Sequence, residues 1–185
     1  MQFEFTPIPG LVILQPKVWE DDRGYFYESY NYNALLEAGI DTQFVQDNQS
    51  RSVRGVLRGL HDQTGDWQQA KLVRVVRGEV FDVAVDLRRD QATYGQWFGL
   101  VLSEQNKQQF FIPRGFAHGF LVLSETAEFL YKTDNYYSGS HEAGIRYDDP
   151  QLDINWDFPQ NQLILSDKDQ ALPFFGHHHE IAGKP

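Results

Sequence analysis

The sequence predicts an all-β domain, a sandwich or barrel of short strands with few short helices. Runs rich in Val, Ile, Leu and aromatic residues recur between residues 11 and 133, and runs of this length and composition are typical of strands. Turn signals such as Arg-Gly, Gly-Gln and Pro-Arg-Gly separate them at short intervals. Aromatic residues make up 15% of the chain, which also favours strands. Closely spaced short strands indicate a β-sandwich or barrel.

The pattern begins with LVILQPKVW (11–19), the turn DDRG (21–24) and a predicted strand YFYESY (25–30). One helix is predicted at NALLEAGI (33–40), where Asn31 or Asn33 can cap the start and Gly39 can end it. The remaining predicted strands are QFVQDNQSRS (43–52), GVLRGLH (55–61), KLVRVV (71–76), EVFDVAVDL (79–87), QWFGLVL (96–102), QFFIP (109–113), GFLVL (119–123) and AEFLYKT (127–133).

The residues after about 134 are interpreted as loops and short helical turns packed against the strands. No repeat, low-complexity tract or linker divides the 185 residues, so we expect one domain over 1–185. Residues from about 175 to 185 include three adjacent His and are expected to form a loose tail.

The chain carries 26 acidic and 16 basic residues, a formal net charge of −10. This balance argues against sequence-independent binding of nucleic acid, which needs a basic surface. No apolar run has the length of a membrane span, and no apolar targeting segment follows the start. Cysteine is absent, which excludes thiol chemistry and is compatible with a reducing compartment. We expect a cytoplasmic protein without nucleic-acid or membrane partners.

Cationic and titratable residues interrupt the apolar strands of residues 56–80. These residues are Arg58, His61, Lys71 and Arg74. Burying an unpaired charge is expensive, so such groups either point to solvent or line a polar cavity. In an acidic protein, clustered cations favour the cavity.

Two segments resemble the paired motifs of cupins, small jelly-roll β-barrels. They are His61-Asp62-Gln63 and PRGFAHGF around His118. Metal-binding cupins carry HxH and a Glu in the first motif, whereas this chain has Gln63 in place of the second His and no recognisable Glu. Two His without a third strong ligand make a poor transition-metal site. We therefore expect a cupin-type jelly roll whose cavity holds both His and no metal.

Six segments together resemble the dTDP-4-dehydrorhamnose 3,5-epimerases, in that family's order and over about residues 10–173. They are DDRGYFYESY, FVQDNQSRSVRGVLRGLHDQ, QAKLVRVVRGEVFDVAVDLR, IPRGFAHGFLVLS, AEFLYKTDNYY and LSDKD. The resemblance implies a cupin-like epimerase without metal or dissociable cofactor. It also implies a homodimer with exchanged strands that acts on a dTDP-sugar in the making of dTDP-L-rhamnose for cell-surface polysaccharide.

The resemblance implies catalytic roles that suit inversion next to a ketone. Such inversion needs a base on one face, an acid on the other and a cation for the enolate oxygen. His61 matches the base, since the unperturbed pKa of an imidazole is about 6.5, close to a working pH. Tyr131 matches the acid and Lys71 the cation. Asp169 matches the carboxylate that orients the base, although Asp167 stands only two residues away.

Further residues match family positions that contact the nucleotide, the phosphates or the sugar. The substrate-binding set is Arg23, Glu28, Gln46, Asn48, Arg58, His118, Tyr137, Glu142 and Lys168. Asp82, like His118, is expected to support the groups that contact the substrate. Strict alternation places Arg58 and His61 on opposite faces, and Gly59 could permit a bulge that brings both to one cavity. The loop DQTGDWQQ (62–69) could shape the mouth of that cavity.

Other readings of the same residues stay open at this point. The chain could instead resemble relatives that invert only one carbon, or related cupins that shift the keto group. A non-catalytic cupin that binds sugar nucleotides is a third reading, although binding alone needs no base opposite an acid. A metal-dependent dioxygenase lacks the ligands.

Overall fold

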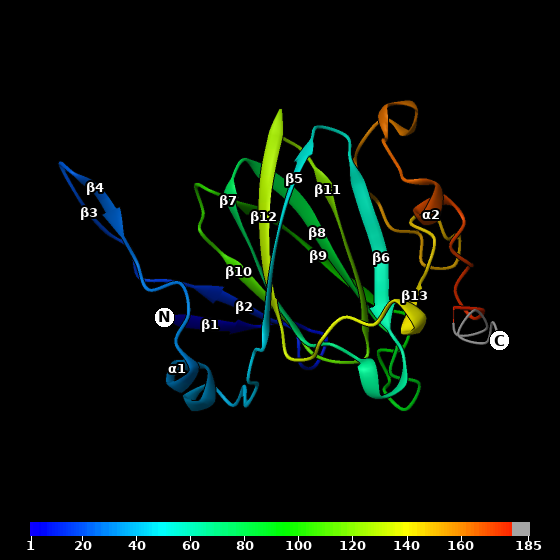
Figure 1. Cartoon of the computed structure of the whole chain (residues 1–185), viewed down its shortest axis with the longest axis horizontal. Helices are drawn as coiled ribbons and strands as arrows, with labels where there is room; N and C mark the ends of the chain where they lie inside the picture. The colour runs from blue at the N-terminus through cyan, green and yellow to red at the C-terminus, as the bar shows by residue number, and fades with distance from the viewer. Residues whose placement is uncertain (179–185) are drawn as a thin grey trace.

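Within residues 1–178, the part of the chain that the structure describes, two antiparallel sheets face each other (Figure 1). The structure is a computed structural model. The first sheet has the order β1 (Gln2–Phe5), β2 (Val12–Gln15), β10 (Gln109–Ile112), β7 (Lys71–Arg77), β12 (Thr126–Thr133), β5 (Gln46–Val53). The second has the order β13 (Glu142–Gly144), β6 (Leu57–Gln63), β11 (Phe116–Val122), β8 (Glu79–Asp86), β9 (Trp97–Ser103). The predicted all-β architecture is confirmed.

The main core lies between the sheets because alternate residues of each strand point inward. Val73, Phe110 and Phe129 come from the first sheet, whereas Ala84 and Phe120 come from the second, and all five are buried. The rings of Phe120 and Phe129 stack across the interface with centroids 4.2 Å apart. This contact joins strands of different sheets beside the polar cavity described below.

A short helix covers part of the outer face of the first sheet. The helix α1 (Tyr32–Glu37) buries Leu35 against residues such as Leu72 and Phe111. Asn31 caps it, since its side chain accepts a hydrogen bond from the Ala34 backbone N–H, and Gly39 follows its end at φ +84°. Both signals were predicted from the sequence.

The segment after β12 covers the outer face of the second sheet. It contains η2 (Gly139–His141), β13, η3 (Gln160–Gln162) and α2 (Asp167–Gln170). Ile145, Trp156 and Phe175 are buried there against the strands. The predicted loops and short turns are confirmed, with β13 as an addition. Phe175 and His178 at the start of the expected tail are buried, while residues 179–185 lie outside the described residues.

A separate hairpin of β3 (Trp19–Asp21) and β4 (Gly24–Phe26) projects away from both sheets, as Figure 1 shows. The predicted strand 25–30 is therefore wrong beyond Phe26, because in this chain the two hairpin strands pair only with each other. The hairpin exposes the aromatic side chains of Trp19, Tyr25 and Phe26.

The β6–β7 connection holds a further single turn, η1 (Gly65–Trp67). No helix within residues 1–178 has the length and apolar character needed to cross a membrane.

Candidate active site

A polar cavity of about 240 Å³ opens between the two sheets. Its walls come from β5 and β12 and the start of β7 on one side, and from β6 and β11 on the other. The lining residues are Ser50, Arg58, His61, Lys71, His118, Phe120, Phe129 and Tyr131. The structure thus brings five of the predicted site residues into one cavity, namely Arg58, His61, Lys71, His118 and Tyr131.

A bulge in β6 lets Arg58 and His61 line the same cavity. The register between β6 and β11 shifts between the pairs His118–His61 and Phe120–Arg58. Gly59 has φ +126°, and a Cβ there would lie 2.6 Å from the Cα of Gly119. Only glycine fits this close approach, so the bulge expected at Gly59 is present.

His61 pairs with Asp169 of α2. The His61 Nε2 and the Asp169 Oδ1 lie 2.5 Å apart, and the Asp169 side chain is only 5% exposed. Asp167 is exposed, so Asp169 and not Asp167 is the carboxylate that pairs with His61. Burial would raise the pKa of Asp169, but hydrogen bonding and charge from His61 and the Ser166 hydroxyl outweigh it and lower that pKa. The carboxylate is therefore ionised beside the imidazole.

His118 pairs with Asp82. Its Nε2 lies 3.0 Å from the Asp82 Oδ2, and both side chains are buried. Burial lowers the pKa of His118, against the opposing effect of the Asp82 carboxylate. The imidazole stacks on Phe129 at a centroid distance of 6.0 Å, so it is fixed in the cavity wall.

Lys71 supplies a cation to the lining of the cavity. Its side chain is buried, and its Nζ donates to the carbonyl oxygen of His61 at 3.4 Å. Burial lowers the pKa of Lys71 to about 8, against the carboxylates of Asp62, Asp82 and Glu142, which favour the charged form. An ammonium with little solvent around it can stabilise a developing oxyanion strongly.

Tyr131 stands on the wall opposite His61. It lies on β12 of the first sheet, whereas His61 lies on β6 of the second. Burial raises the pKa of Tyr131, with Arg58 acting in the opposite direction. The phenol therefore keeps its proton at neutral pH. A group that can accept a proton and one that can donate a proton face the cavity from different sheets.

A hydrogen-bonded row of predicted substrate-binding residues lies beside the cavity. Gln46 donates to the Asn48 Oδ1 at 3.0 Å and accepts from the Tyr137 backbone N–H at 3.2 Å. The Tyr137 hydroxyl donates to Glu142 at 2.9 Å, and Glu142 forms an ion pair with Lys168. Asn48 pairs with Tyr131 across the β5–β12 ladder, which places this row next to the proposed acid.

Comparison with known proteins identifies the family. A family model described as dTDP-4-dehydrorhamnose 3,5-epimerase matches residues 5–177. The chain belongs to this family. The dTDP-4-dehydrorhamnose 3,5-epimerase of Pseudomonas aeruginosa is 57% identical over 164 residues, which are 88% of this chain and 90% of the relative.

Solved structures of the epimerase family have the same fold. The crystal structure of dTDP-4-dehydrorhamnose 3,5-epimerase from Elizabethkingia anophelis matches with a TM-score of 0.91 and 52% identity, covering 95% of this chain and 96% of that one. The enzyme from Legionella pneumophila, solved in complex with dTDP-4-keto-L-rhamnose, matches with a TM-score of 0.90 and 52% identity, covering 94% and 92%. The fold is thus the predicted cupin-type jelly roll, and the chain is an isomerase of this family.

Two residues that the epimerase resemblance assigned to substrate binding lie away from the cavity in this chain. Arg23 belongs to the projecting hairpin, is 90% exposed, and forms an ion pair with Asp21 at 2.5 Å. Glu28 follows the hairpin and accepts a hydrogen bond from the Asn31 side chain at 3.0 Å. Neither lines the cavity.

Three cavity residues were not predicted from the sequence: Ser50, Phe120 and Phe129. Each stands two positions from a residue that was predicted, namely Asn48, His118 or Tyr131. Side chains two apart on a strand share a face, so applying the alternation to every predicted strand residue would have found them. The two Phe rings give the cavity an apolar wall.

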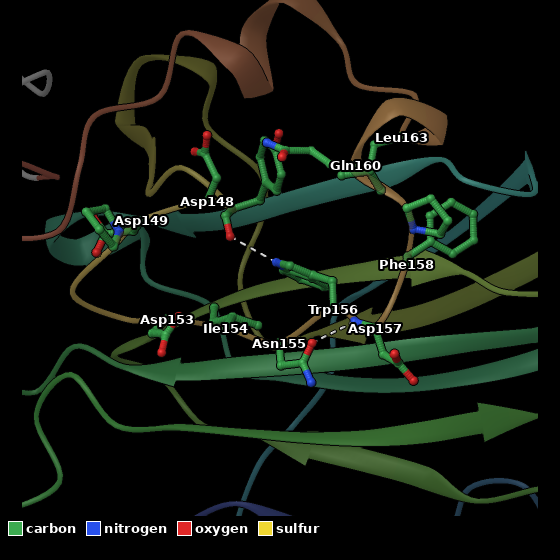
Figure 2. A pocket seen from close by; sticks show the side chains of 13 residues that line it. Asp148, Asp149, Asp153, Ile154, Asn155, Trp156, Asp157, Phe158, Gln160 and Leu163 are labelled. Carbon is green, nitrogen blue, oxygen red and sulfur yellow. Dashed lines mark hydrogen bonds between the residues drawn. The ribbon is translucent and has the colours of Figure 1, made fainter.

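A larger cavity of about 620 Å³ lies under the C-terminal segment and is shown in Figure 2. Asp148, Asp149, Asp153 and Asp157 all line it. The buried Asp149 accepts backbone hydrogen bonds, one of them from Phe175 at 2.7 Å, so it holds the segment together. This acidic lining contrasts with the cavity at His61, which Arg58 and Lys71 also line.

Proposed function

We propose that this chain inverts C3 and C5 of dTDP-4-keto-6-deoxy-D-glucose to give dTDP-4-keto-L-rhamnose, in the making of dTDP-L-rhamnose. The observation that carries the proposal is the placement of His61 and Tyr131 on opposite walls of one cavity, with Lys71 buried between the sheets. Epimerisation requires removal of a proton from one face of a carbon and its return from the other.

Each inversion proceeds through an enolate. His61 takes the proton from the carbon next to the ketone, and Asp169 stabilises the resulting imidazolium. The electron pair of the broken C–H bond forms a carbon–carbon double bond, and the π pair of the carbonyl moves onto the keto oxygen, where Lys71 stabilises the negative charge. Tyr131 then protonates the carbon from the opposite face as the ketone re-forms. Proton exchange with solvent returns His61 to its neutral form and Tyr131 to the phenol, so the cycle can repeat at the second carbon.

The charged part of the substrate is bound by residues at the edge of the cavity. Arg58 and Lys168 supply positive charge for the diphosphate, and an arginine can hold two phosphate oxygens at once. Tyr137 offers an exposed ring on which a thymine can stack. Gln46 and Asn48 supply amide groups, and the Asn48 Nδ2 is buried without a hydrogen-bond partner in the described part of the chain.

We further propose that the enzyme is a homodimer in the cytoplasm. The projecting hairpin of one copy would carry Arg23, and the residues after it Glu28, to the cavity of the other. Exposed aromatic side chains on that hairpin support this arrangement, since apolar surface of this kind favours contact with a partner.

Deuterium incorporation tests the function. The enzyme is incubated with dTDP-4-keto-6-deoxy-D-glucose in deuterated water, and the product is trapped by a reductase and examined by NMR. Because both carbons are deprotonated and then reprotonated, we expect deuterium at C3 and C5 and the L-rhamnose configuration. Label at one carbon would instead identify a mono-epimerase, and a carbonyl moved to C3 would identify a ketoisomerase. Tight dTDP binding without any label would leave only a binding protein.

Two variants separate the base from the acid in the same experiment. His61→Asn should lower both exchange and inversion by about 10²–10⁴, because it removes the general base. Tyr131→Phe should lower inversion more than exchange, because deprotonation by His61 remains. Equal losses of exchange and inversion in Tyr131→Phe would contradict the assignment of Tyr131 as the acid. Both variants should still bind dTDP.

A further inference from the structure

Ser166 contacts the carboxylate that pairs with the catalytic His. Its hydroxyl donates a hydrogen bond to the Asp169 Oδ2 at 2.8 Å, and its oxygen accepts one from the Asp169 backbone N–H at 3.1 Å. The other carboxylate oxygen, Oδ1, faces His61 Nε2 at 2.5 Å. The two oxygens of Asp169 are thus divided between Ser166 and His61.

The local structure explains why this carboxylate needs support. Asp169 lies in α2, which has four residues, and so short a helix has little stability of its own. The preceding segment is tied to the start of β6, where the Leu57 N–H donates to the Ile164 carbonyl at 3.1 Å. Ser166 is the N-cap of α2 and stands between this attachment point and Asp169. It is therefore placed to set the orientation of the Asp169 side chain.

We propose that Ser166 is a positioning residue for the reaction, whose hydroxyl holds one oxygen of Asp169 so that the other stays on His61. The proposal rests on the function proposed above, in which His61 becomes an imidazolium in each half of the cycle. A carboxylate free to rotate would stabilise that imidazolium less well. The hydroxyl also favours the ionised carboxylate, because it donates to it.

The same oxygen also caps the helix, so the test must separate capping from donation. Ser166→Ala removes both. Ser166→Thr keeps both, since threonine also caps helices and carries a hydroxyl. Ser166→Asp keeps the cap, because aspartate is among the best N-cap residues, but it has no proton to donate and adds a negative charge beside Asp169.

We expect the rate to follow hydroxyl donation and not capping. Loss of a hydrogen bond to a charged group lowers kcat by about 10-fold to 100-fold in Ser166→Ala and Ser166→Asp. Ser166→Thr should stay within about 3-fold of the parent enzyme, and KM should change little in all three. A Ser166→Asp enzyme as fast as the parent would overturn the proposal, because capping alone would then explain the serine. The proposal would also be overturned if kcat fell in all three variants in step with the melting temperature, because lost stability would then explain the lower rates.

A second measurement does not depend on epimerase activity. A short hydrogen bond between His61 and Asp169 should give a strongly deshielded imidazole N–H proton in the NMR spectrum, assigned by its loss in His61→Asn. We expect that proton in the parent and in Ser166→Thr, and its loss or upfield shift in Ser166→Ala and Ser166→Asp. An unchanged signal in all of them would overturn the positioning role. If the parent lacked epimerase activity, the proposed function would fail while this measurement still tested Ser166.

Discussion

At the scale of single residues, burial changes the chemistry of Lys71 most clearly. An exposed lysine keeps its charge at any pH near neutrality, but desolvation lowers the pKa of Lys71 to about 8. The ammonium predominates at pH 7 and is lost as the pH rises through that value. Since Lys71 is proposed to stabilise the enolate oxygen, its titration falls in a range where activity can be measured.

We therefore expect kcat to fall as the pH rises through about 8. Tyr131 should not cause this loss, because burial raises its pKa above the ordinary value and it titrates later. In Lys71→Arg the guanidinium stays charged, so the alkaline loss should move to higher pH even if the variant is slower. In Lys71→Met activity should be low at every pH. Steady-state rates between about pH 6 and 10 test this. If kcat of Lys71→Arg fell at the same alkaline pH as kcat of the parent enzyme, the titrating group would be a residue other than Lys71.

At the scale of elements, two loops form a clasp beside the cavity. Residues 62–69, which include the end of β6 and the turn after it, contact the loop 134–141, which carries Tyr137. Trp67 stacks on His141 with centroids 5.5 Å apart. The Asn135 side chain donates to the Asp66 carbonyl at 2.8 Å, and the Ser138 N–H donates to the Gln63 side chain at 2.9 Å. The loop suspected from the sequence to shape the cavity mouth thus supports the proposed nucleotide contact.

Trp67→Ala should weaken substrate binding without slowing the chemical step. A lost aromatic contact of this kind is worth about 0.5–1.5 kcal/mol, so the Kd for dTDP and the KM should rise by about 2-fold to 10-fold while kcat changes little. The control is Val101→Ala, at an exposed position on β9. It should leave the Kd for dTDP and the KM unchanged. A drop in kcat at unchanged KM would show that the clasp acts on His61 or Tyr131 and not on the nucleotide contact.

At the scale of the whole molecule, the sheets and the hairpin differ in whether their apolar side chains are buried. The sheets bury their own core, whereas the hairpin exposes Trp19, Tyr25 and Phe26 and places Arg23 far from the cavity of its own chain. Exchange of hairpins in a dimer would bury these rings and complete two sites at once. In the proposed homodimer, each active site therefore contains residues from both copies.

Mixing of inactive variants tests this sharing. Arg23→Ala and His61→Asn should each lower activity as homodimers. In a mixed dimer, the copy with intact His61 would receive Arg23 from its partner, so one site is complete. Unfolding the two variants together and refolding them should restore up to about a quarter of the parent activity, since half of the dimers are mixed and each has one good site. Refolding each variant alone is the control. No recovery, with mixed dimers confirmed by mass spectrometry, would contradict a shared site.

The sequence by itself determined the fold class and most of the strands, and it supplied the residues that we propose as the reacting groups. These follow from local information: the short apolar runs, the helix cap expected at Asn31 or Asn33, and the motifs that contain His61, Lys71 and Tyr131. Strand formation and capping depend mainly on neighbours in the chain, so they can be predicted from it.

The tertiary structure decided what depends on distant contacts. It selected Asp169 over Asp167, because α2 turns only the former toward His61. It also kept Arg23 out of the cavity of its own chain. The lowered pKa of Lys71 likewise arises from burial between two sheets whose strands are far apart in the sequence. Distances between side chains and exclusion of water are properties of the packed chain, so no local pattern could have supplied them.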